Sequence, residues 1–462
     1  MATEQAINME TEFTNLNFTG WLKERFIHTI GTFAAQPGKS IWGCSKDRSA
    51  AKAIYRMLAT LVGFILALNE IIKAHRQATF KRMLNAIGVI LLVQDTASAN
   101  YDSQKKMKGL KYNCNQSRGV NIHTCIAVTI QGLVLGLLSQ IFYDRQKPKD
   151  DTPDSEKSKR PIEEKESFRW LKSFMESING LPEWIKTLTV CDREGDIYEF
   201  MNLIAIMGHL FLIRVMHNRI TKDNQRILDA IRKEKCIGKV TIKVPRDTRK
   251  NMKEREAVLR ICLKKFEIQR PSNLNKNTGL LPFITVWVIR AYEENAPKGV
   301  QPIDWFLMTN EPVEGFQAAF KRIEYYTQRW KIERFHYVLK SGCCNIEKRQ
   351  ARSMDTMKIL IVMYSIVSVF ILNLTYLGRI HPELPCDLIF DETEWKLLYC
   401  VANKTDKPPT KPYSIQEAIK YLSWLGGPKR APSDGPPGVK TISMGLEKLN
   451  TLLTYKNWMG GG

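Results

Sequence analysis

One stretch of the chain, Tyr325 to Lys340, concentrates side chains that could do chemistry. Its sixteen residues include neither Gly nor Pro, which predicts a single continuous helix. With roughly 100° between successive residues, one narrow stripe of that helix carries a phenol, a guanidinium, a carboxylate and an ammonium, with an imidazole at its edge: Tyr326, Arg329, Glu333, Lys340 and His336. A carboxylate flanked by phosphate-binding cations favours metal-assisted phosphoryl transfer. Taken alone, the stripe fits an ordinary solvated face of ion pairs better, so the rest of the chain must decide.

Two further acids follow apolar runs that are typical of buried strands. Asp95 comes at the end of the run Gly88–Thr96, and Asp192 at the end of a shorter run that begins at Thr187. Because strand ends expose ligands at a sheet edge, these aspartates and Glu333 are expected to form a set of three carboxylates. Their hard oxygen atoms suit Mg²⁺, with Mn²⁺ as a substitute. The set predicts a two-ion site that activates an attacking oxygen and stabilises a leaving one.

The elements around these acids indicate an α/β fold. Three consecutive antiparallel strands are predicted first, then a helix, two more strands and a last strand before the Tyr325 helix: residues 88–96, 120–128, 133–138, 163–178, 187–192, 210–215 and 305–309. Residues from about 219 to 304 contain basic, strand-like runs and are interpreted as a β-rich insertion. Residues 147–165 are predicted to be a polar surface loop, and residues 426–438 a linker rich in Pro and Gly.

Composition narrows the class of partner. The net charge is +22 and the pI is about 9.5, which favours a polyanion such as nucleic acid. The sequence shows neither an amphipathic basic helix nor a lipidation motif, so an anionic membrane surface is not favoured as the partner. The first residues lack the basic and apolar regions of a signal peptide. Ten cysteines without a CxxC pair indicate free thiols in a reducing cytoplasm, with neither a zinc site nor a disulfide framework.

The length of 462 residues predicts two or three domains. Residues 1–85 are interpreted as a small, basic, N-terminal helical domain that binds DNA, 86–378 as a catalytic domain that includes the insertion, and 379–462 as a C-terminal helical domain. The apolar run from Ile359 to Leu372 is interrupted by serines, so a buried core helix is expected there rather than a membrane span.

The residues singled out above match a family. The pattern Tyr326-x2-Arg329-x3-Glu333-x6-Lys340 matches the Tyr-Arg-Glu-Lys signature of DDE transposases. The chain resembles the insertion-sequence-four family of these enzymes, which includes the transposon-five type, from end to end. Further matching stretches carry the resemblance: Gln94–Ser98, Val190–Ile197, Phe211–Arg214 and Trp305–Val313. The signature is specific, because it fixes four residue types at three spacings and both aspartates precede it in order.

The resemblance implies an RNase H-like catalytic core with a β-strand insertion, flanked by an N-terminal helical DNA-binding domain and a C-terminal helical dimerisation domain. It also implies cut-and-paste transposition. A metal-activated water nicks one strand at a transposon-end inverted repeat, the freed 3′-OH forms a hairpin, a second water opens it, and the same 3′-OH joins target DNA. The implied partners are double-stranded DNA and, in the synaptic complex, a second copy of the chain. A nucleoid-associated location in a bacterial cytoplasm is expected.

The resemblance also implies roles for the site residues. Asp95, Asp192 and Glu333 would be catalytic and would hold the metal ions. Four side chains would contact phosphates near the cleavage point: Arg214, Arg329, Lys340 and Tyr326. Trp305 is at the position where the family stacks a flipped base beside the hairpin. The alternative role for Trp305 is that of a buried core aromatic on a strand. The role of His336 stays open between a contact to the scissile region and packing at the helix edge.

Other candidates are given structural roles. His123 lies on a predicted strand and is expected to be a buried core histidine. Three residues that follow Asp192 are expected to form its turn or to support it: Arg193, Glu194 and Asp196.

Two other classes compete with an active transposase. One is a catalytically silent, transposase-derived DNA-binding protein. The intact acids and the complete Tyr-Arg-Glu-Lys set argue against it, because a retired active site need not keep metal ligands. The other is a simple RNase H-like nuclease, which leaves the Trp305 strand and the basic insertion without a role. The N-terminal basic segment matches the family only loosely, so the sequence of the terminal repeat is not predicted.

Overall fold

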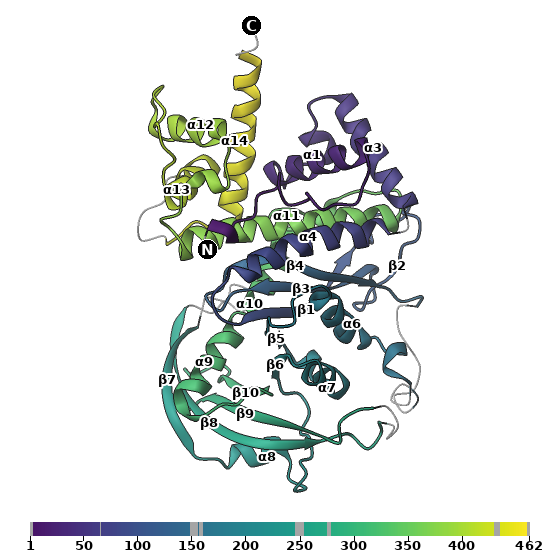
Figure 1. Cartoon of the computed structure of the whole chain (residues 1–462), viewed down its shortest axis with the longest axis vertical. Helices are drawn as coiled ribbons and strands as arrows, with labels where there is room; N and C mark the ends of the chain where they lie inside the picture. The colour runs from purple at the N-terminus through teal and green to yellow at the C-terminus, as the bar shows by residue number, and fades with distance from the viewer. Residues whose placement is uncertain are drawn as a thin grey trace.

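The structure is a computed structural model, and it describes residues 3–64, 66–147, 156, 160–244, 254–274, 279–428 and 435–459. The predicted surface loop at 147–165 and the predicted linker at 426–438 lie partly outside these ranges. The described chain has a mixed α/β fold, in which helices pack on a long sheet and a helical part lies at one end (Figure 1).

Ten strands of the described chain form one sheet. Their order along it is β2-β3-β1-β5-β6-β10-β9-β8-β7, and β4 pairs with β3. The bounds are β1 Ile90–Asn100, β2 Lys111–Tyr112, β3 Arg118–Val128, β4 Val134–Tyr143, β5 Thr187–Cys191, β6 Leu210–Arg214, β7 Cys236–Val244, β8 Arg255–Gln269, β9 Phe283–Glu293 and β10 Asp304–Thr309. The neighbours β1, β5 and β6 run parallel, and the other pairings are antiparallel.

The predicted strands are confirmed, with the two-residue β2 as an addition. β1, β3 and β4 are consecutive antiparallel neighbours, as their apolar patterns indicate. The basic runs between residues 219 and 304 form β7, β8 and β9, and β10 joins them to β6. The β-rich segment therefore extends the main sheet instead of forming a separate layer.

The helices pack on both the central strands and the extension of the sheet. Their bounds are α1 Trp21–Ala35, α2 Ile41–Cys44, α3 Arg48–Gly63, α4 Ala67–Leu84, α6 Phe168–Ile178, α7 Tyr198–Ile206, α8 Ile227–Arg232, α9 Gly315–Thr327, α10 Trp330–Tyr337, α11 Met354–Ile380, α12 Glu392–Asn403, α13 Ile415–Gly426 and α14 Val439–Met459. α4 and α6 contact β4, α9 contacts β7 and β8, and α10 contacts β1. α10, which carries Glu333, thus packs directly against one of the central parallel strands.

α11 is the central helix of the fold. It contacts β4, the N-terminal helices α1, α3 and α4, and the C-terminal helices α13 and α14 (Figure 1). It is long and apolar enough to cross a membrane, but 94% of its most apolar window is buried inside the protein. The prediction of a buried core helix in this region is confirmed.

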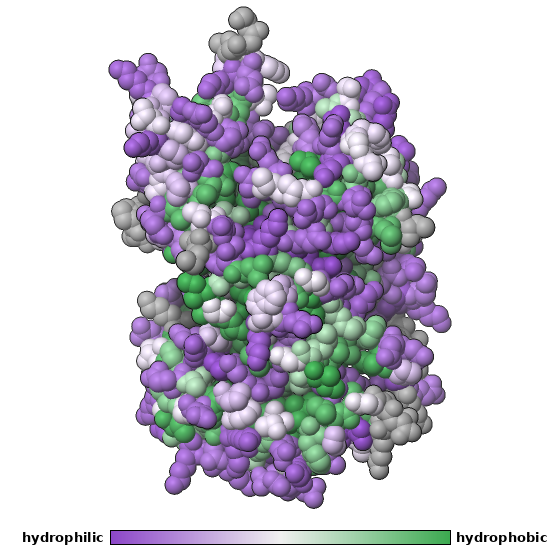
Figure 2. Space-filling view, viewed as in Figure 1, coloured by the Kyte–Doolittle hydropathy of each residue, from purple (hydrophilic) through white to green (hydrophobic). Residues whose placement is uncertain are grey.

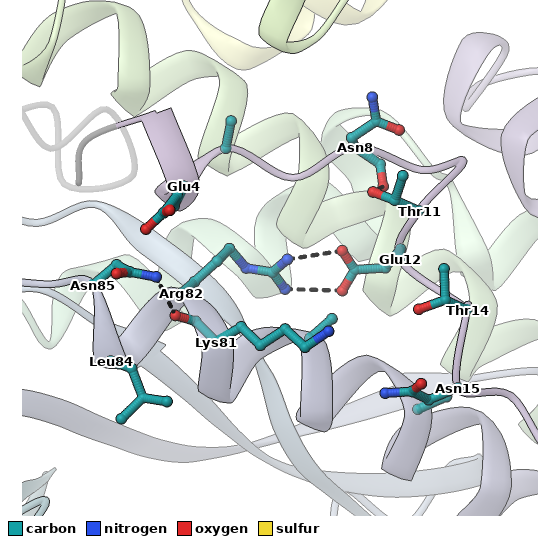
Figure 3. A pocket seen from close by; sticks show the side chains of 13 residues that line it. Glu4, Asn8, Thr11, Glu12, Thr14, Asn15, Lys81, Arg82, Leu84 and Asn85 are labelled. Carbon is teal, nitrogen blue, oxygen red and sulfur yellow. Dashed lines mark hydrogen bonds and ion pairs between the residues drawn. The ribbon is translucent and has the colours of Figure 1, made fainter.

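A buried ion cluster fixes the N-terminal segment to α4 and β4. The Glu12 carboxylate accepts two hydrogen bonds of 2.8 Å from the Arg82 guanidinium (Figure 3). Its Oε1 also lies 2.6 Å from Nδ1 of His75. Arg82 Nε donates to the Leu135 carbonyl at 2.6 Å, and His75 Nε2 accepts from the Leu137 amide at 2.9 Å. The cluster therefore links three segments that are far apart in the sequence.

The surface and the cysteines agree with the composition. Hydrophilic side chains cover most of the face in Figure 2, with hydrophobic patches mainly across its middle and lower parts. All ten cysteines are free, as the absence of a disulfide framework in the sequence predicts.

The prediction of one continuous helix from Tyr325 to Lys340 is wrong. The segment divides into α9, α10 and a π-helical turn, Val338–Gly342. Between α9 and α10, the amides of Gln328 and Arg329 donate to carbonyls three residues back, at 3.1 and 3.0 Å. These bonds make a tighter, 3₁₀-type turn. No Gly or Pro marks it, so helix propensity does not reveal it, and the side chains of the expected stripe come from three successive segments.

Candidate active site

Strand register brings Asp95 and Asp192 to the same level of the sheet. In the parallel pair β1 and β5, Val93 lies opposite Val190. Each aspartate comes two residues after one of these valines, so the two aspartates are at the same level and on the same face of the sheet. Because neighbouring strands are about 4.8 Å apart, the two carboxylates are held close together. This pairing needs only the sheet register.

The two aspartates reach this position differently. Asp192 directly follows β5 and begins a short turn, where its Oδ1 accepts a hydrogen bond of 2.9 Å from the Glu194 amide. Asp95 is not at the end of its strand, because β1 continues to Asn100 and stays paired with β3. Only the pairing with β5 ends before it, at Val93. The expectation of two strand-terminal acids therefore holds for Asp192 alone.

Glu333 approaches the same edge from α10, and Arg329 connects it to Asp95. Arg329 Nη2 donates to Glu333 Oε1 at 2.6 Å, and Arg329 Nη1 lies 4.0 Å from Asp95 Oδ2. The guanidinium is mostly buried, with 13% of its side chain exposed. It therefore supplies one positive charge that partly balances two of the three carboxylates.

The electrostatic state of Asp95 reflects this crowding of acids. Burial and the nearby Asp192 carboxylate raise the pKa of Asp95 to about 7, with a smaller contribution from Glu333. The Thr96 amide, which donates to Asp95 Oδ1 at 2.8 Å, and Arg329 lower the pKa but do not outweigh the rise. A carboxyl whose pKa is raised by a neighbouring like charge is a common feature of functional sites.

Arg214 lies one strand further along the same edge. In the parallel pair β5 and β6, Cys191 lies opposite Ile213, so Arg214 comes level with Asp192. Burial lowers the pKa of Arg214, while Tyr326 and Asp192 raise it. Its Nε has no hydrogen-bond partner among the described residues. The guanidinium thus keeps an unused donor within the buried part of the site.

Tyr326 and Trp305 form an aromatic contact beside these cations. The rings meet edge to face with centroids 5.9 Å apart. Tyr326 is buried, and the Arg329 guanidinium lies 6.0 Å from its ring centroid. Trp305 is only partly buried, at the start of β10. Trp305 is therefore not a fully buried core aromatic, and part of its indole faces solvent.

Lys340 lies in the π-helical turn and is engaged within the protein. Its Nζ donates to the Ser98 carbonyl of β1 at 2.6 Å and lies 3.2 Å from Glu347 Oε1. The same Glu347 oxygen accepts from the Asn100 amide at 2.9 Å. The structure thus places Lys340 beside β1, where its contacts connect this strand to the segment after α10.

His336 and His123 occupy different surroundings. Nδ1 of His336 is 3.9 Å from Asp95 Oδ2, which is too long for a hydrogen bond, and its Nε2 has no partner in the described chain. Burial, with Lys340 as a second cause, lowers the pKa of His336 to about 3. His123 is buried, and its two nitrogens lie 2.8 Å from the Thr96 hydroxyl and 3.0 Å from the Gln94 amide oxygen. The expectation of a satisfied core histidine is confirmed for His123.

The residues after Asp192 have the supporting roles expected of them. Arg193–Gly195 forms a single 3₁₀ turn. Asp196 is buried, and its Oδ1 accepts 2.9 and 2.6 Å hydrogen bonds from Arg219. Its Oδ2 accepts from the amides of Met216 and His217, both at 2.8 Å. This carboxylate fixes the chain after β6.

Arg169 was not identified from the sequence, although it touches both aspartate segments. Its Nε donates to the Thr96 hydroxyl at 3.2 Å, and its Nη2 lies 2.9 Å from Glu194 Oε2. The guanidinium lies 5.3 Å from the centroid of the Tyr143 ring. Since α6 carries no motif, no spacing in the sequence could have connected Arg169 to the acids; only the sheet order does so.

The donor chemistry of the three acids fits a divalent cation, although the ligands do not converge in this structure. Among the described residues, no group of three His, Cys, Asp or Glu side chains is close enough to hold one ion. Hard carboxylate oxygens suit ions such as Mg²⁺. Burial is the main cause of the raised pKa of Asp95, and the Asp192 carboxylate adds to it, so a cation near both acids would favour their charged forms. The arrangement of Arg329 explains the gap, because it already occupies an oxygen of Glu333.

Two family models match the chain. The model "Transposase DDE domain" matches residues 171–370, and the model "Transposase Tn5 dimerisation domain" matches residues 366–458. Among solved structures, a cryo-EM structure of a piggyBac transposase synaptic complex with hairpin DNA is 11% identical. That alignment covers 82% of this chain and 73% of that one with a TM-score of 0.36.

These matches identify the class of protein. The chain is a DDE transposase that resembles the transposases of the Tn5 type. The DDE domain makes it a nuclease-type enzyme of DNA transposition, and DDE domains use divalent metal ions. The resemblance predicted from the Tyr326–Lys340 signature and the two aspartates is confirmed.

Proposed function

We propose that this chain is a cut-and-paste transposase that binds the inverted repeats at the ends of a transposon, cleaves them through a hairpin and joins the 3′-OH ends to target DNA. The observation that carries this proposal is the placement of Asp95 and Asp192 at one level of β1 and β5, with Glu333 joined to Asp95 through Arg329. Three acids around one sheet edge, bordered by basic side chains, suit repeated phosphoryl transfer at one site.

The order of the central strands supports an RNase H-like core. β4, β3, β1, β5 and β6 are neighbours in that order, with β3 antiparallel to β1 and with β1, β5 and β6 parallel. Within this proposal, residues 86–378 form the catalytic domain with its β-rich insertion at about 219–304. Residues 1–85 form the helical DNA-binding domain, and 379–462 form the helical dimerisation domain.

Asp95, Asp192 and Glu333 would hold two Mg²⁺ ions, for which Mn²⁺ can substitute. Bound there, the ions supply charge for the attacking and leaving oxygens of each displacement. The chain itself brings Asp95 and Asp192 together through the sheet register. It also keeps the His336 imidazole, which burial favours in its neutral form, 3.9 Å from Asp95.

The cationic side chains would hold the phosphate that reacts. Arg329 can grip it with two parallel N–H groups, and Arg214 has an Nε without a partner in the described structure. Tyr326 is close enough to both guanidinium groups for each to lower the pKa of its hydroxyl, and it would add a hydroxyl contact. Lys340 would reach a neighbouring phosphate after leaving the Ser98 carbonyl.

Four displacements at phosphorus make up the proposed reaction. Water forms a bond to phosphorus at the transposon end and the 3′-oxygen leaves with a proton as a 3′-OH. That 3′-OH attacks the opposite strand, expelling the flanking 3′-oxygen and closing the hairpin. A second water attacks the hairpin phosphorus and expels the same 3′-oxygen, which leaves with a proton as a 3′-OH. The restored 3′-OH then attacks a phosphorus of target DNA and expels a target 3′-oxygen, which leaves as a 3′-OH. Trp305 would stack the base that leaves the helix at the hairpin step.

The partners follow from charge and from the dimerisation match. A net charge of +22 favours double-stranded DNA, both as transposon ends and as target. The match to a dimerisation domain covers about the C-terminal half of α11, all of α12 and α13 and nearly all of α14, which supports a homodimer in the synaptic complex. The proposed location is the nucleoid of a bacterial cytoplasm.

Cleavage of a duplex that carries the outer end of the encoding element tests the proposal. Wild-type protein with Mg²⁺ is expected to nick this duplex, whereas Asp95→Ala, Asp192→Ala and Glu333→Ala are expected to lose cleavage and largely keep binding. The control is Glu183→Ala, which replaces an exposed acid and should leave cleavage unchanged. Asp196 is not used for this purpose, because its carboxylate holds the chain after β6. End binding without any cleavage by the wild type would favour a catalytically silent, transposase-derived DNA-binding protein.

A further inference from the structure

A single guanidinium joins the segment after the catalytic helix to the N-terminal helices. Arg349 is buried, with 7% exposure, and its Nε and Nη2 donate to the Cys344 carbonyl at 3.0 and 2.8 Å. Its Nη2 also donates to the Pro37 carbonyl at 2.5 Å, and its Nη1 donates to the Lys39 carbonyl. Its Cζ lies 4.4 Å from the centroid of the Tyr364 ring in α11. The Arg349 contacts found in the described chain are thus carbonyls and one aromatic face.

The Arg349 side of this junction is continuous with α10, which carries Glu333. The amides of Cys343 and Cys344 both donate to the Val338 carbonyl, at 3.1 and 2.9 Å, and close the π-helical turn after α10. Glu347 ties the same segment to β1 through the Asn100 amide and Lys340. A displacement of Arg349 would therefore act on the end of α10 and on the strand that carries Asp95.

The other side of the junction is the loop between α1 and α2. Besides the two carbonyls taken by Arg349, the Gly38 amide of this loop donates to Glu447 Oε1 in α14 at 2.7 Å. A Cβ at position 38 would come within 2.6 Å of that oxygen, so glycine allows the close approach. The loop leads directly to Ser40, whose side chain caps α2, and to the exposed Trp42.

We infer that Arg349 is a positioning residue that fixes the distance between the DNA-binding helices and the catalytic acids. The inference rests on the proposed function, in which residues 1–85 bind the transposon end and Asp95, Asp192 and Glu333 cleave it. A planar guanidinium with donors in several directions can hold two backbone segments at one spacing, which a lysine cannot do. The nick would then fall at a constant distance from the bound sequence.

The test compares Arg349→Met with Arg352→Met, which removes an exposed positive charge three residues away. Both variants lose one charge, so their end binding should weaken by a similar small factor, within about threefold. Arg349→Met is expected to nick at several neighbouring positions and at least tenfold more slowly, whereas Arg352→Met should nick at the wild-type position. A folded Arg349→Met protein that nicks at the wild-type position and rate would overturn the inference.

Two further measurements keep the inference separate from folding and from the proposed function. Arg349→Lys keeps the charge and provides a milder variant if Arg349→Met does not fold, and it is expected to scatter the nick in the same way. Hydrogen exchange needs no cleavage. In the wild type, duplex end DNA should slow amide exchange in residues 37–45 and also in 338–349. In the Arg349 variants only the first segment should respond, and a response of both segments would refute the coupling even if the wild type cuts no DNA.

Discussion

Arg329 donates a 2.6 Å hydrogen bond to the carboxylate of Glu333, one helical turn away. The contact places a fixed positive charge on an oxygen that a metal ion would need. Since Arg329 Nη1 also approaches Asp95 to 4.0 Å, the guanidinium partly balances the acids in the absence of a cation. Under the proposed function, Arg329 and a divalent ion would therefore compete for Glu333 until a phosphate offers Arg329 another partner.

The first prediction is that Arg329→Gln binds Mn²⁺ more tightly than the wild type when no DNA is present. A hydrogen bond between charged groups contributes about 1.5–3 kcal/mol, so its removal should improve Mn²⁺ affinity by roughly tenfold or more. Electron paramagnetic resonance of the free ion during a Mn²⁺ titration measures this directly. Arg334→Gln, an exposed arginine of the same helix, serves as the control and should not change the affinity. Weaker Mn²⁺ binding by Arg329→Gln would instead show that Arg329 orients Glu333 for the ion.

The second prediction concerns Trp305, which is partly buried and meets Tyr326 edge to face. Trp305→Ala is expected to make the first nick at close to the wild-type rate and to form about tenfold less hairpin, because base stacking on an aromatic contributes about 1–3 kcal/mol. Trp305→Phe should recover most of the hairpin. Denaturing electrophoresis of an end-labelled duplex separates the two products.

A control for this prediction comes from the neighbouring strand. Trp287 in β9 is also partly buried, and its ring packs against Lys265. Trp287→Ala removes the same side chain from the β-rich segment without touching Tyr326. Equal loss of hairpin in both variants would point to a general weakening of the sheet and would remove the stacking role of Trp305.

Much of this site follows from the sequence because its main contacts are local or set by strand register. Asp95 and Asp192 were predictable as partners, since each follows a run of apolar residues that forms one of two neighbouring strands. The Arg329–Glu333 pair is a contact between residues four apart. The buried helix α11 was also predictable, because its apolar run is too long to lie on the surface and is interrupted by serines.

Other parts of the site depend on contacts that no local pattern encodes. The 3₁₀ turn at Gln328 and Arg329 contains no helix-breaking residue, and the π-helical turn ends at backbone contacts with Cys343 and Cys344. Arg349 binds carbonyls more than 300 positions away in the chain. Such positions become visible only when the fold brings distant segments together.

The last prediction is a dependence of stability on pH that arises from Glu12 (Figure 3). Burial raises the pKa of Glu12, but the opposing effect of Arg82 and His75 is larger, so the net pKa falls to about 2. Since the folded pKa lies below the ordinary value of 4.5, Glu12 stabilises the folded state above pH 4.5, and this contribution is lost as the pH falls towards 2. The size is about 3 kcal/mol, because the folded pKa is about 2 against the ordinary 4.5 and each tenfold change in proton affinity corresponds to about 1.36 kcal/mol.

Glu12→Gln is therefore expected to lower the free energy of unfolding by about 3–5 kcal/mol at pH 7, because Arg82 is left buried without its acid. At pH 3 the difference from the wild type should be smaller by about 2 kcal/mol, because wild-type Glu12 has by then lost part of its stabilising effect. Urea unfolding at both pH values measures the two differences. Glu4 is an exposed acid that lines the pocket of Figure 3 together with Glu12, and Glu4→Gln should leave stability unchanged at either pH. A deficit of Glu12→Gln that is equal at pH 7 and pH 3 would mean that the loss comes from packing of the amide and not from the charge of Glu12.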